Sequence, residues 1–254
     1  MKRLTLSLVA ALTATAPASA QTGVDLALVL AVDMSGSMDE GEHALQRGGY
    51  VAAIRSPEVW AAIRAGAYRR IALSYLEWAG AASQVVVIDW RLIDSADAAR
   101  AFADDLEASP LSRIRGTSIS GAIDYARTMV ESSGYEPWRK VIDISGDGAN
   151  NRGRPVAEAG DAAVARGVTI NGLPIILRTA FAEGDLARYY ADCVIGGPGA
   201  FALPVRAEAE MADAIRRKLV QEIAGLPPPA IPAQAGPPAD CLIGERIRRL
   251  YLDP

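Results

Sequence analysis

The chain has 254 residues, which is long enough for one large globular domain. Half of its residues are hydrophobic and 22% are charged, so the composition is that of a folded soluble protein and excludes a disordered chain. Its 30 acidic residues outnumber its 26 basic residues, which argues against nucleic acid or anionic lipid as a partner.

The N-terminal segment has the three parts of a secretory signal peptide. Lys2 and Arg3 supply positive charge, residues 4–14 are mostly apolar, and Ala18-Ser19-Ala20 offers a small-residue cleavage site. The alternative is a membrane anchor, but a span needs about 20 apolar residues and hydroxyl side chains interrupt this run. We therefore expect residues 1–20 to be removed and the mature protein to be periplasmic or secreted, without stable membrane insertion. Removing Lys2 and Arg3 leaves 24 basic against 30 acidic residues, a formal charge of −6.

Residues 21–224 alternate between apolar runs typical of strands and amphipathic stretches typical of helices. The predicted strands are, in chain order, 26–33, 71–78, 85–93, 140–145, 169–177 and 199–205. The predicted helices are 40–55, a short one from Pro57, 96–106, one after Thr117, 155–166, 182–190 and 208–223. This order predicts an α/β domain with a doubly wound, mostly parallel sheet and helices on both faces. The short turn at 80–83 predicts that the second and third strands pair antiparallel at the sheet edge.

Oxygen-bearing side chains follow the first predicted strand. Asp33, Ser35 and Ser37 come directly after the apolar run 26–32, with Gly36 between the two serines. Ligands of open α/β sheets bind at the carboxyl ends of the strands, and hard oxygen groups around a turning glycine suit a small divalent cation such as Mg²⁺. The alternative is that these residues form the N-cap of the next helix and bind no ligand.

Two later segments carry similar residues to the same predicted edge. Thr117 stands just before a helix whose apolar positions follow helical spacing. Asp147 follows the strand at 140–145, between two glycines. We expect both side chains near the loop that follows the first strand.

A DxSxS loop, a later Gly-Thr and a strand-end Asp-Gly, in this order, resemble the von Willebrand factor A fold with its metal-ion-dependent adhesion site. The resemblance covers roughly residues 25–224 and implies one antiparallel edge strand. It also implies a bound Mg²⁺ or Mn²⁺ and the metal-site residues Asp33, Ser35, Ser37, Thr117 and Asp147. The segments 145–151 and 192–201 resemble, more narrowly, a bacterial family of exported von Willebrand A-like proteins of unassigned function.

The resemblance implies an exported, divalent-cation-dependent binding module of the adhesion or assembly type, not an enzyme. Its partner would be an unidentified protein that presents an Asp or Glu carboxylate to the cation. The alternatives are a metal-dependent hydrolase and a structural domain with a vestigial metal site. A hydrolase needs a general base, and the one histidine, His43, is expected on the surface of the helix at 40–55, away from the site.

The C-terminal part of the chain has a different composition. Residues 225–239 are rich in Pro and Ala and predict an extended tether, and residues 240–254 form a short amphipathic tail. Cys193 and Cys241 suit a disulfide in an oxidising compartment, with two buried free thiols as the alternative. Two cysteines so far apart do not suggest a zinc site. We expect the tail to dock on the domain, the alternative being a partner-binding helix.

Overall fold

The apolar run at the start of the domain forms the central strand of a five-stranded sheet. The computed structural model describes residues 21–111, 116–177, 185–226 and 237–251. The strand order is β3-β2-β1-β4-β5, and all pairs are parallel except β2 with β3. The predicted mostly parallel sheet with one antiparallel edge strand is therefore confirmed. The strands are β1 (Thr22–Asp33), β2 (Ile71–Trp78), β3 (Gln84–Ile93), β4 (Tyr135–Gly146) and β5 (Val168–Pro174).

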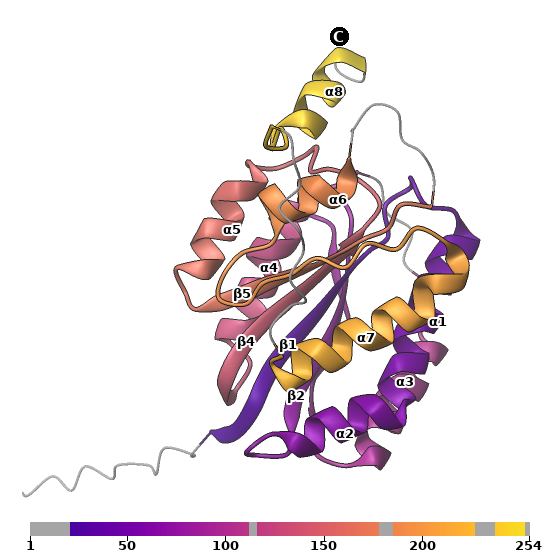
Figure 1. Cartoon of the computed structure of the whole chain (residues 1–254), viewed down its shortest axis with the longest axis vertical. Coiled ribbons are helices and arrows are strands. Elements are labelled where there is room, and N and C mark those ends of the chain that lie inside the picture. The colour runs from indigo at the N-terminus through magenta and orange to yellow at the C-terminus, as the bar shows by residue number, and fades with distance from the viewer. Residues whose placement is uncertain (1–20, 112–115, 178–184, 227–236, 252–254) are drawn as a thin grey trace, which may run out of the picture.

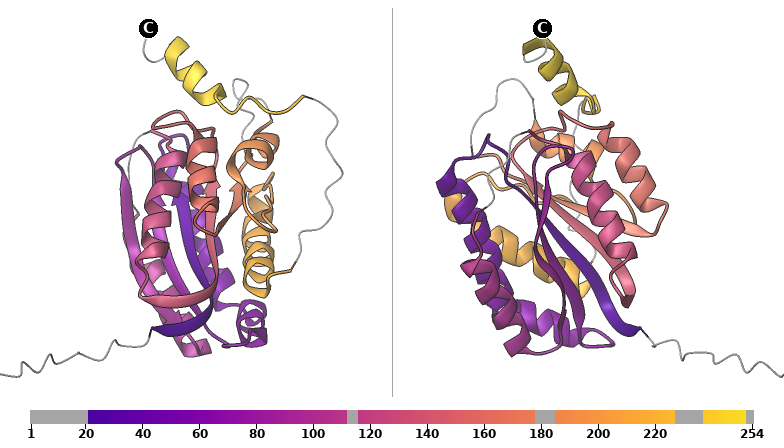
Figure 2. Two further views of the ribbon diagram at one scale, coloured as in Figure 1. Left: turned by 90° about the vertical axis from the view of Figure 1, so that its left-hand side faces the viewer. Right: turned by 180° about the vertical axis from the view of Figure 1, so that it is seen from behind.

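Helices cover both faces of the sheet, as Figures 1 and 2 show. Apolar side chains of one helical layer share a core with one face of the sheet, and those of the other layer share a core with the opposite face. The first layer contains α1 (Glu40–Arg55), α2 (Pro57–Ala65), α3 (Ala96–Ala108) and α7 (Met211–Ala224). The second contains α4 (Ile119–Glu131), α5 (Val156–Val164), α6 (Leu186–Tyr189) and the π-helical turn Tyr190–Val194.

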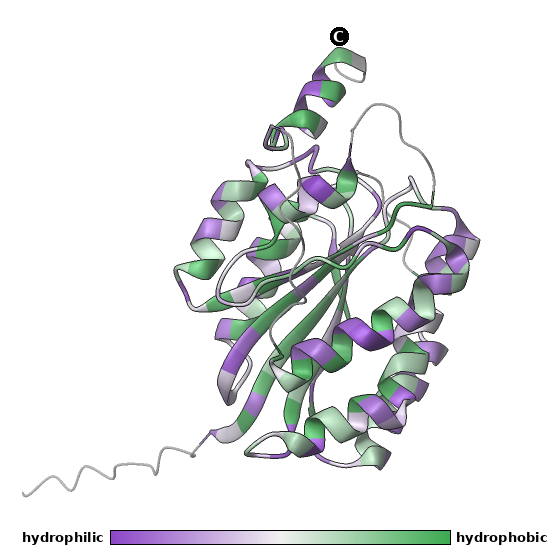
Figure 3. Cartoon of the chain, in the orientation of Figure 1, coloured by the Kyte–Doolittle hydropathy of each residue, from purple (hydrophilic) through white to green (hydrophobic). Residues whose placement is uncertain are grey.

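The position of β1 follows from its composition. Every residue from Leu26 to Val32 is at most 1% exposed. Leu28 and Leu30 pack into the first core, whereas Val29 and Ala31 pack into the second, because successive side chains of a strand point to opposite faces. The strands at the centre of Figure 3 are accordingly mostly hydrophobic. Burying each large aliphatic side chain contributes about 1.5–3 kcal/mol. The burial of β1 therefore strongly stabilises its position at the centre of the sheet.

One predicted strand, 199–205, is not a strand of the sheet. The segment runs beside β5 and makes isolated bridges at Ala202 and Val205. Pro204 has no N–H to donate to a ladder, and the preceding turn contains two glycines with positive φ, Gly197 and Gly199. The predicted helix at 182–190 is also shorter: its first three residues lie outside the described part, and the rest forms α6 and the start of the π-helical turn.

The C-terminal tail is attached to the domain by a disulfide. Cys193 and Cys241 are bonded, with their Cα atoms 5.5 Å apart, as predicted. The tail forms α8 (Ile243–Tyr251), which lies beyond the carboxyl ends of the strands (Figure 1). The predicted signal peptide and residues 227–236 of the predicted tether lie outside the described residues. Within the part of the chain that is described, no helix is long and apolar enough to cross a bilayer.

We expect the exported protein to contain no thiol that reacts with an alkylating agent before reduction. After reduction, both Cys193 and Cys241 should react, and the Cys241→Ser variant should show one reactive thiol without reduction. Intact-mass measurement of protein alkylated in denaturant without reductant checks this, because the denaturant exposes a buried thiol such as that of Cys193 in the Cys241→Ser variant. Two labelled cysteines in unreduced wild-type protein would contradict the pairing.

Two adjacent glycines of α1 provide a matched test of the contact between α1 and α7. A Cβ at Gly49 would stand 2.6 Å from Cδ1 of Ile215 on α7, whereas Gly48 has nothing within 4 Å. We expect Gly49→Val to lower the free energy of unfolding by about 1–3 kcal/mol, because it overpacks the core. Gly48→Val should stay within about 0.5 kcal/mol of wild type. Urea unfolding of both variants measures the difference, and equal effects would rule out a close contact at Gly49.

Candidate metal centre

The loop after β1 begins with a buried carboxylate. Asp33 is fully buried, and its Oδ1 accepts a hydrogen bond of 2.7 Å from the backbone N–H of Ser35. The N-cap of the following helix α1 is Asp39, which forms a capping box with Glu42. The alternative interpretation of the DxSxS segment as a helix cap is therefore wrong, since Asp39 fills that position.

A line of hydroxyl groups leads from this loop to the end of β4. The Oγ atoms of Ser35 and Ser37 lie 2.9 Å apart, and Ser37 Oγ donates a 2.7 Å hydrogen bond to Asp147 Oδ1. Ser37 and Asp147 are 110 residues apart in sequence. The structure thus brings four of the five predicted site residues together at one edge of the sheet.

The fifth residue, Thr117, reaches the same edge through its backbone. Thr117 and Asn151 exchange two hydrogen bonds, of 3.0 and 3.3 Å, which join the Thr117 loop to the loop after Asp147. Ser118 N donates to Ala79 O at 2.7 Å, next to the residue Trp78 whose carbonyl accepts from Met34 N at 2.8 Å. All three loops are therefore tied together by main-chain bonds. That the Thr117 hydroxyl is a ligand stays a prediction.

The two carboxylates oppose each other electrostatically. Burial and the neighbouring charge of Asp147 raise the pKa of Asp33 well above its ordinary value, and burial raises the pKa of Asp147. The second oxygen of Asp33, Oδ2, is buried and has no hydrogen-bond partner among the described residues. An unpaired carboxylate in a site of low polarity is unfavourable. A bound cation would offset the repulsion between Asp33 and Asp147, and it would give Oδ2 of Asp33 an interaction partner.

The donor set fits a small hard cation. It consists of two carboxylates and up to three hydroxyl groups, all of them oxygen ligands of the kind that Mg²⁺ and Mn²⁺ prefer. The described residues contain no group of three or more His, Cys, Asp and Glu side chains placed to hold a metal. The serine and threonine oxygens would therefore have to supply part of the coordination.

His43 contradicts the expectation of a surface residue away from the site. It is only 7% exposed and lies against the loop, where a backbone hydrogen bond with Ser35 and the charge of Asp147 oppose the lowering of its pKa by burial. The inner face of the first half of α1 is polar, because it meets the strand ends and not the apolar core. On this face Gln46 donates a 2.8 Å hydrogen bond to Ser145 Oγ, and Arg47 pairs with the buried Glu77.

The sequence predicts that residues 150–153, after Asp147, form a loop at the rim of the site, and Asn150 of this loop is fully buried. Its Oδ1 accepts from Ser120 N at 3.0 Å, and its Nδ2 donates to Glu245 of α8 at 2.7 Å. Asn150 therefore connects the Thr117 helix, the Asp147 loop and the C-terminal tail. This agrees with the tendency of asparagine side chains to bind nearby backbone in turns, here between β4 and α5.

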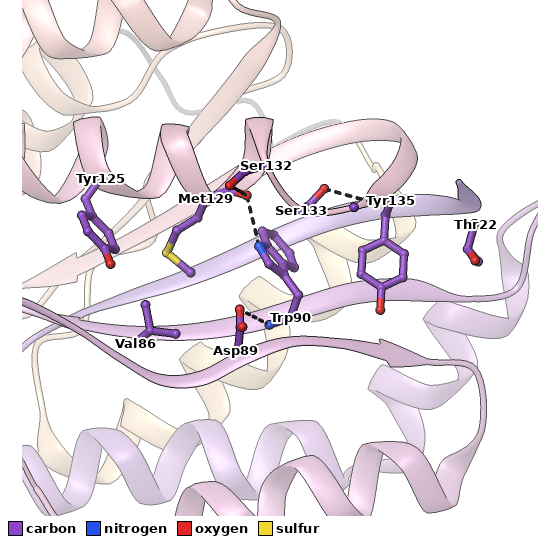
Figure 4. Close-up of a pocket in the computed structure, with 10 residues that line it drawn as sticks. Thr22, Val86, Asp89, Trp90, Tyr125, Met129, Ser132, Ser133 and Tyr135 are labelled. Atoms are coloured by element: carbon purple, nitrogen blue, oxygen red, sulfur yellow. Dashed lines mark hydrogen bonds between the residues drawn. The ribbon is translucent and has the colours of Figure 1, made fainter. Parts of the chain in front are cut away.

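A separate hollow lies on the flank of the sheet, between β3 and α4 (Figure 4). Trp90 Nε1 donates to Met129 O at 3.1 Å, and the exposed Asp89 accepts from its neighbour's N–H at 2.7 Å. The indole is thus held by a hydrogen bond within the protein, and Asp89 faces solvent.

The chain belongs to the family described as "Protein of unknown function (DUF1194)", whose model matches residues 23–227. A comparison with curated protein sequences found no match.

Solved structures share the fold. A von Willebrand factor type A protein from Catenulispora acidiphila matches with a TM-score of 0.57 and 16% identity, over 79% of this chain and 43% of that one. The von Willebrand domain of the type V pili tip protein Mfa5 from Porphyromonas gingivalis matches with 0.58 and 11%, over 84% and 99%. Proximal thread matrix protein 1 from the mussel byssus, with a zinc-occupied MIDAS motif, matches with 0.55 and 14%, over 80% and 49%. This chain thus spans about half the length of the mussel protein. The predicted von Willebrand A fold is confirmed.

The raised pKa of Asp33 has a consequence for stability without metal. The folded state holds a proton on Asp33 more tightly than the unfolded state does, so stability should fall as pH rises through the folded pKa. Asp33→Asn keeps an acceptor for Ser35 N–H but cannot ionise. In chelator, we expect this variant to melt at or above the wild-type temperature at neutral pH, with less loss of stability as pH rises above the ordinary range of a carboxyl pKa.

The control for this experiment is Asp89→Asn, which removes an exposed carboxylate on β3. It should reproduce the pH dependence of the wild type. An Asp33→Asn variant that melts well below wild type in chelator at pH 8 would show that the ionised carboxylate stabilises the metal-free fold.

Proposed function

We propose that this protein is an exported, divalent-cation-dependent protein-binding module of the adhesion or assembly type. Asp33, Ser35, Ser37, Thr117 and Asp147 would hold one Mg²⁺ or Mn²⁺ at the carboxyl edge of the sheet. The observation that carries the proposal is the continuous line Ser35–Ser37–Asp147 beside the buried, unpartnered Oδ2 of Asp33. This arrangement supports the proposal because hard oxygens from two strand ends gather beside a buried carboxylate oxygen that has no other partner among the described residues.

The composition of this donor set favours a carboxylate as the partner's contact. Beside the two acidic side chains, the other ligands would be neutral hydroxyl groups. Neutral ligands reduce the positive charge of a divalent cation less than carboxylates do, so the cation would still attract another anion. When bound, the cation would supply a position at which an Asp or Glu of a partner protein replaces a water. The prearranged loops lower the ordering cost of that contact, because main-chain hydrogen bonds already join them.

Two further observations support an exported binding protein. The disulfide between Cys193 and Cys241 suits the periplasm or the exterior, and it agrees with the predicted signal peptide at residues 1–20. Among proteins of the same fold are a type V pili tip protein and a thread matrix protein of the mussel byssus.

The arrangement gives less support to a hydrolase. General base catalysis requires a group within hydrogen-bond reach of the substrate, and His43 is covered by the loop at 7% exposure. Burial also lowers the pKa of this imidazole. His43 is better suited to supporting the Ser35 backbone than to abstracting a proton.

We expect mature wild-type protein to bind one Mg²⁺ or Mn²⁺ per chain and to melt at a higher temperature when the cation is added, because the cation binds the folded form. Asp33→Asn should lose both effects, whereas Asp89→Asn should keep them. Isothermal titration and thermal melts provide the measurements. No heat of binding at millimolar cation would favour the vestigial-site alternative.

The partner itself can be sought with the same three proteins as baits in an envelope extract. A protein captured by wild type and Asp89→Asn in Mg²⁺, released by chelator, and not captured by Asp33→Asn would support the proposal. Capture that chelator does not reverse would place the interaction at another surface.

A further inference from the structure

A second group of ionisable side chains lies beneath α7, inside the first core. Lys218 and Glu222 stand one turn apart on α7 and face Asp143 of β4. Each of the three side chains is at most 1% exposed. The candidate metal centre does not use any of them.

The amine and the carboxyl group are held in reactive proximity. Lys218 Nζ lies 2.5 Å from Asp143 Oδ1, and it also contacts Glu222 Oε1. Since a C–O bond is about 1.2 Å, the carboxyl carbon of Asp143 is within about 3.7 Å of this nitrogen. Reacting atoms in productive enzyme complexes lie about 3–3.5 Å apart. Despite the short separation, Asp143 Oδ1 has no hydrogen bond of ordinary geometry among the described residues.

The surroundings exclude water and hold the carboxyl groups in place. The Phe201 ring centre lies 5.7 Å from Lys218 Nζ. Tyr50 donates a long hydrogen bond of 3.4 Å to Asp143 Oδ2, and Asn171 donates one of 2.9 Å to Glu222 Oε1. In such a place an ion pair gains nothing from hydration, and the excess of carboxyl groups over amines adds a buried negative charge.

The surroundings favour one proton shared between the carboxyl groups of Asp143 and Glu222, because both are buried and Lys218 supplies only one positive charge. Burial raises the pKa of Asp143 above its ordinary value, and burial together with the charge of Asp143 raises the pKa of Glu222 to about 7. One proton shared between Asp143 and Glu222, together with a cationic Lys218, gives the cluster no net charge, and the proposal concerns the form in which that proton is on Asp143. A neutral carboxyl group is also the form that an amine can attack.

We propose that Lys218 and Asp143 form an intramolecular amide bond, with Glu222 as the group that transfers protons. The Lys218 ammonium gives one proton to Glu222, and the freed nitrogen lone pair attacks the carboxyl carbon of neutral Asp143. Glu222 then protonates the departing hydroxyl group, which leaves as water, and accepts a proton from the nitrogen. The C–N bond replaces a C–O bond, one water is released, no redox change occurs, and Glu222 ends protonated.

The product would join β4 to α7 and replace two opposite charges by a neutral amide. Because the amide cannot be hydrolysed readily without water, the dry surroundings favour its persistence. The proposal is independent of the metal site, since neither Asp33 nor Asp147 takes part.

The test is a mass measurement on the mature, exported chain. Relative to its sequence, reduced wild-type protein should be lighter by one water, about 18 Da. After residue 20 the sequence has only two lysines, Lys140 and Lys218. Trypsin should yield peptide 141–152 joined to a peptide that begins at Lys218, because the modified side chain is not cleaved. This mapping separates the bond from cyclisation of an N-terminal Gln21, which removes ammonia, about 17 Da.

Matched variants locate the chemistry. Lys140→Met should keep the link, with the β4 peptide then spanning 140–152, because trypsin still cleaves after Arg139. Lys218→Met should lose the link, and Glu222→Gln should lose it or form it many-fold more slowly. Unlinked 141–152 and cleavage after Lys218 in the wild type would overturn the proposal, leaving a buried ion pair only. A Glu222→Gln variant linked at the wild-type rate would overturn the role of Glu222. The wild-type mapping decides the main point even where a variant fails to fold.

Discussion

The parallel register of β1 with its two neighbours is the constraint on which the rest of the molecule depends. Val32 pairs with Ser145 of β4, and Asp33 pairs with Trp78 of β2. Both strands therefore end at the same level of the sheet. The carboxylates of Asp33 and Asp147 consequently lie close to each other. Apolar burial along β1 holds this register, since a slip of one residue would turn every side chain to the other face. The free energy gained by burying the apolar side chains of β1 thus holds the two acidic side chains close together.

Asp143, buried within β4, and the partly buried Asp147, just beyond the end of that strand, lie in very different surroundings. Asp143 points into the first core, where Lys218 supplies a positive charge from the protein itself. Asp147, four residues later, meets hydroxyl groups and the like-charged Asp33. Asp143 thus has a cationic neighbour within the fold, whereas Asp147 has hydroxyl groups and another acid as neighbours. The charge of the neighbouring groups therefore distinguishes a structural acid from a candidate binding acid more clearly than the extent of burial does.

Much of the fold and part of the site could be predicted from sequence, because the signals were local. The helix at 40–55 and the strand at 71–78 were predicted with the observed bounds, since their patterns lie within single segments. Asp33, Ser35 and Ser37 stand within five residues, so their proximity needed no knowledge of the fold. The burial of His43 depended on which face of α1 meets the strand ends, which its own helix does not reveal. Lys218 and Asp143 are 75 positions apart in the sequence, and only the packing of α7 onto β4 brings them together.

The direction of β1 has a mechanical consequence. Thr22 begins the strand at one end of the domain and Asp33 ends it at the other, so tension between the N-terminal end of the domain and a molecule held at the strand ends would run along β1 (Figure 1). Parallel ladders on both sides bind this strand along most of its length. Pulling along its axis loads these hydrogen bonds together in shear, whereas a peeling force would break them one at a time. The central strand is therefore oriented to transmit load through the domain without unravelling it.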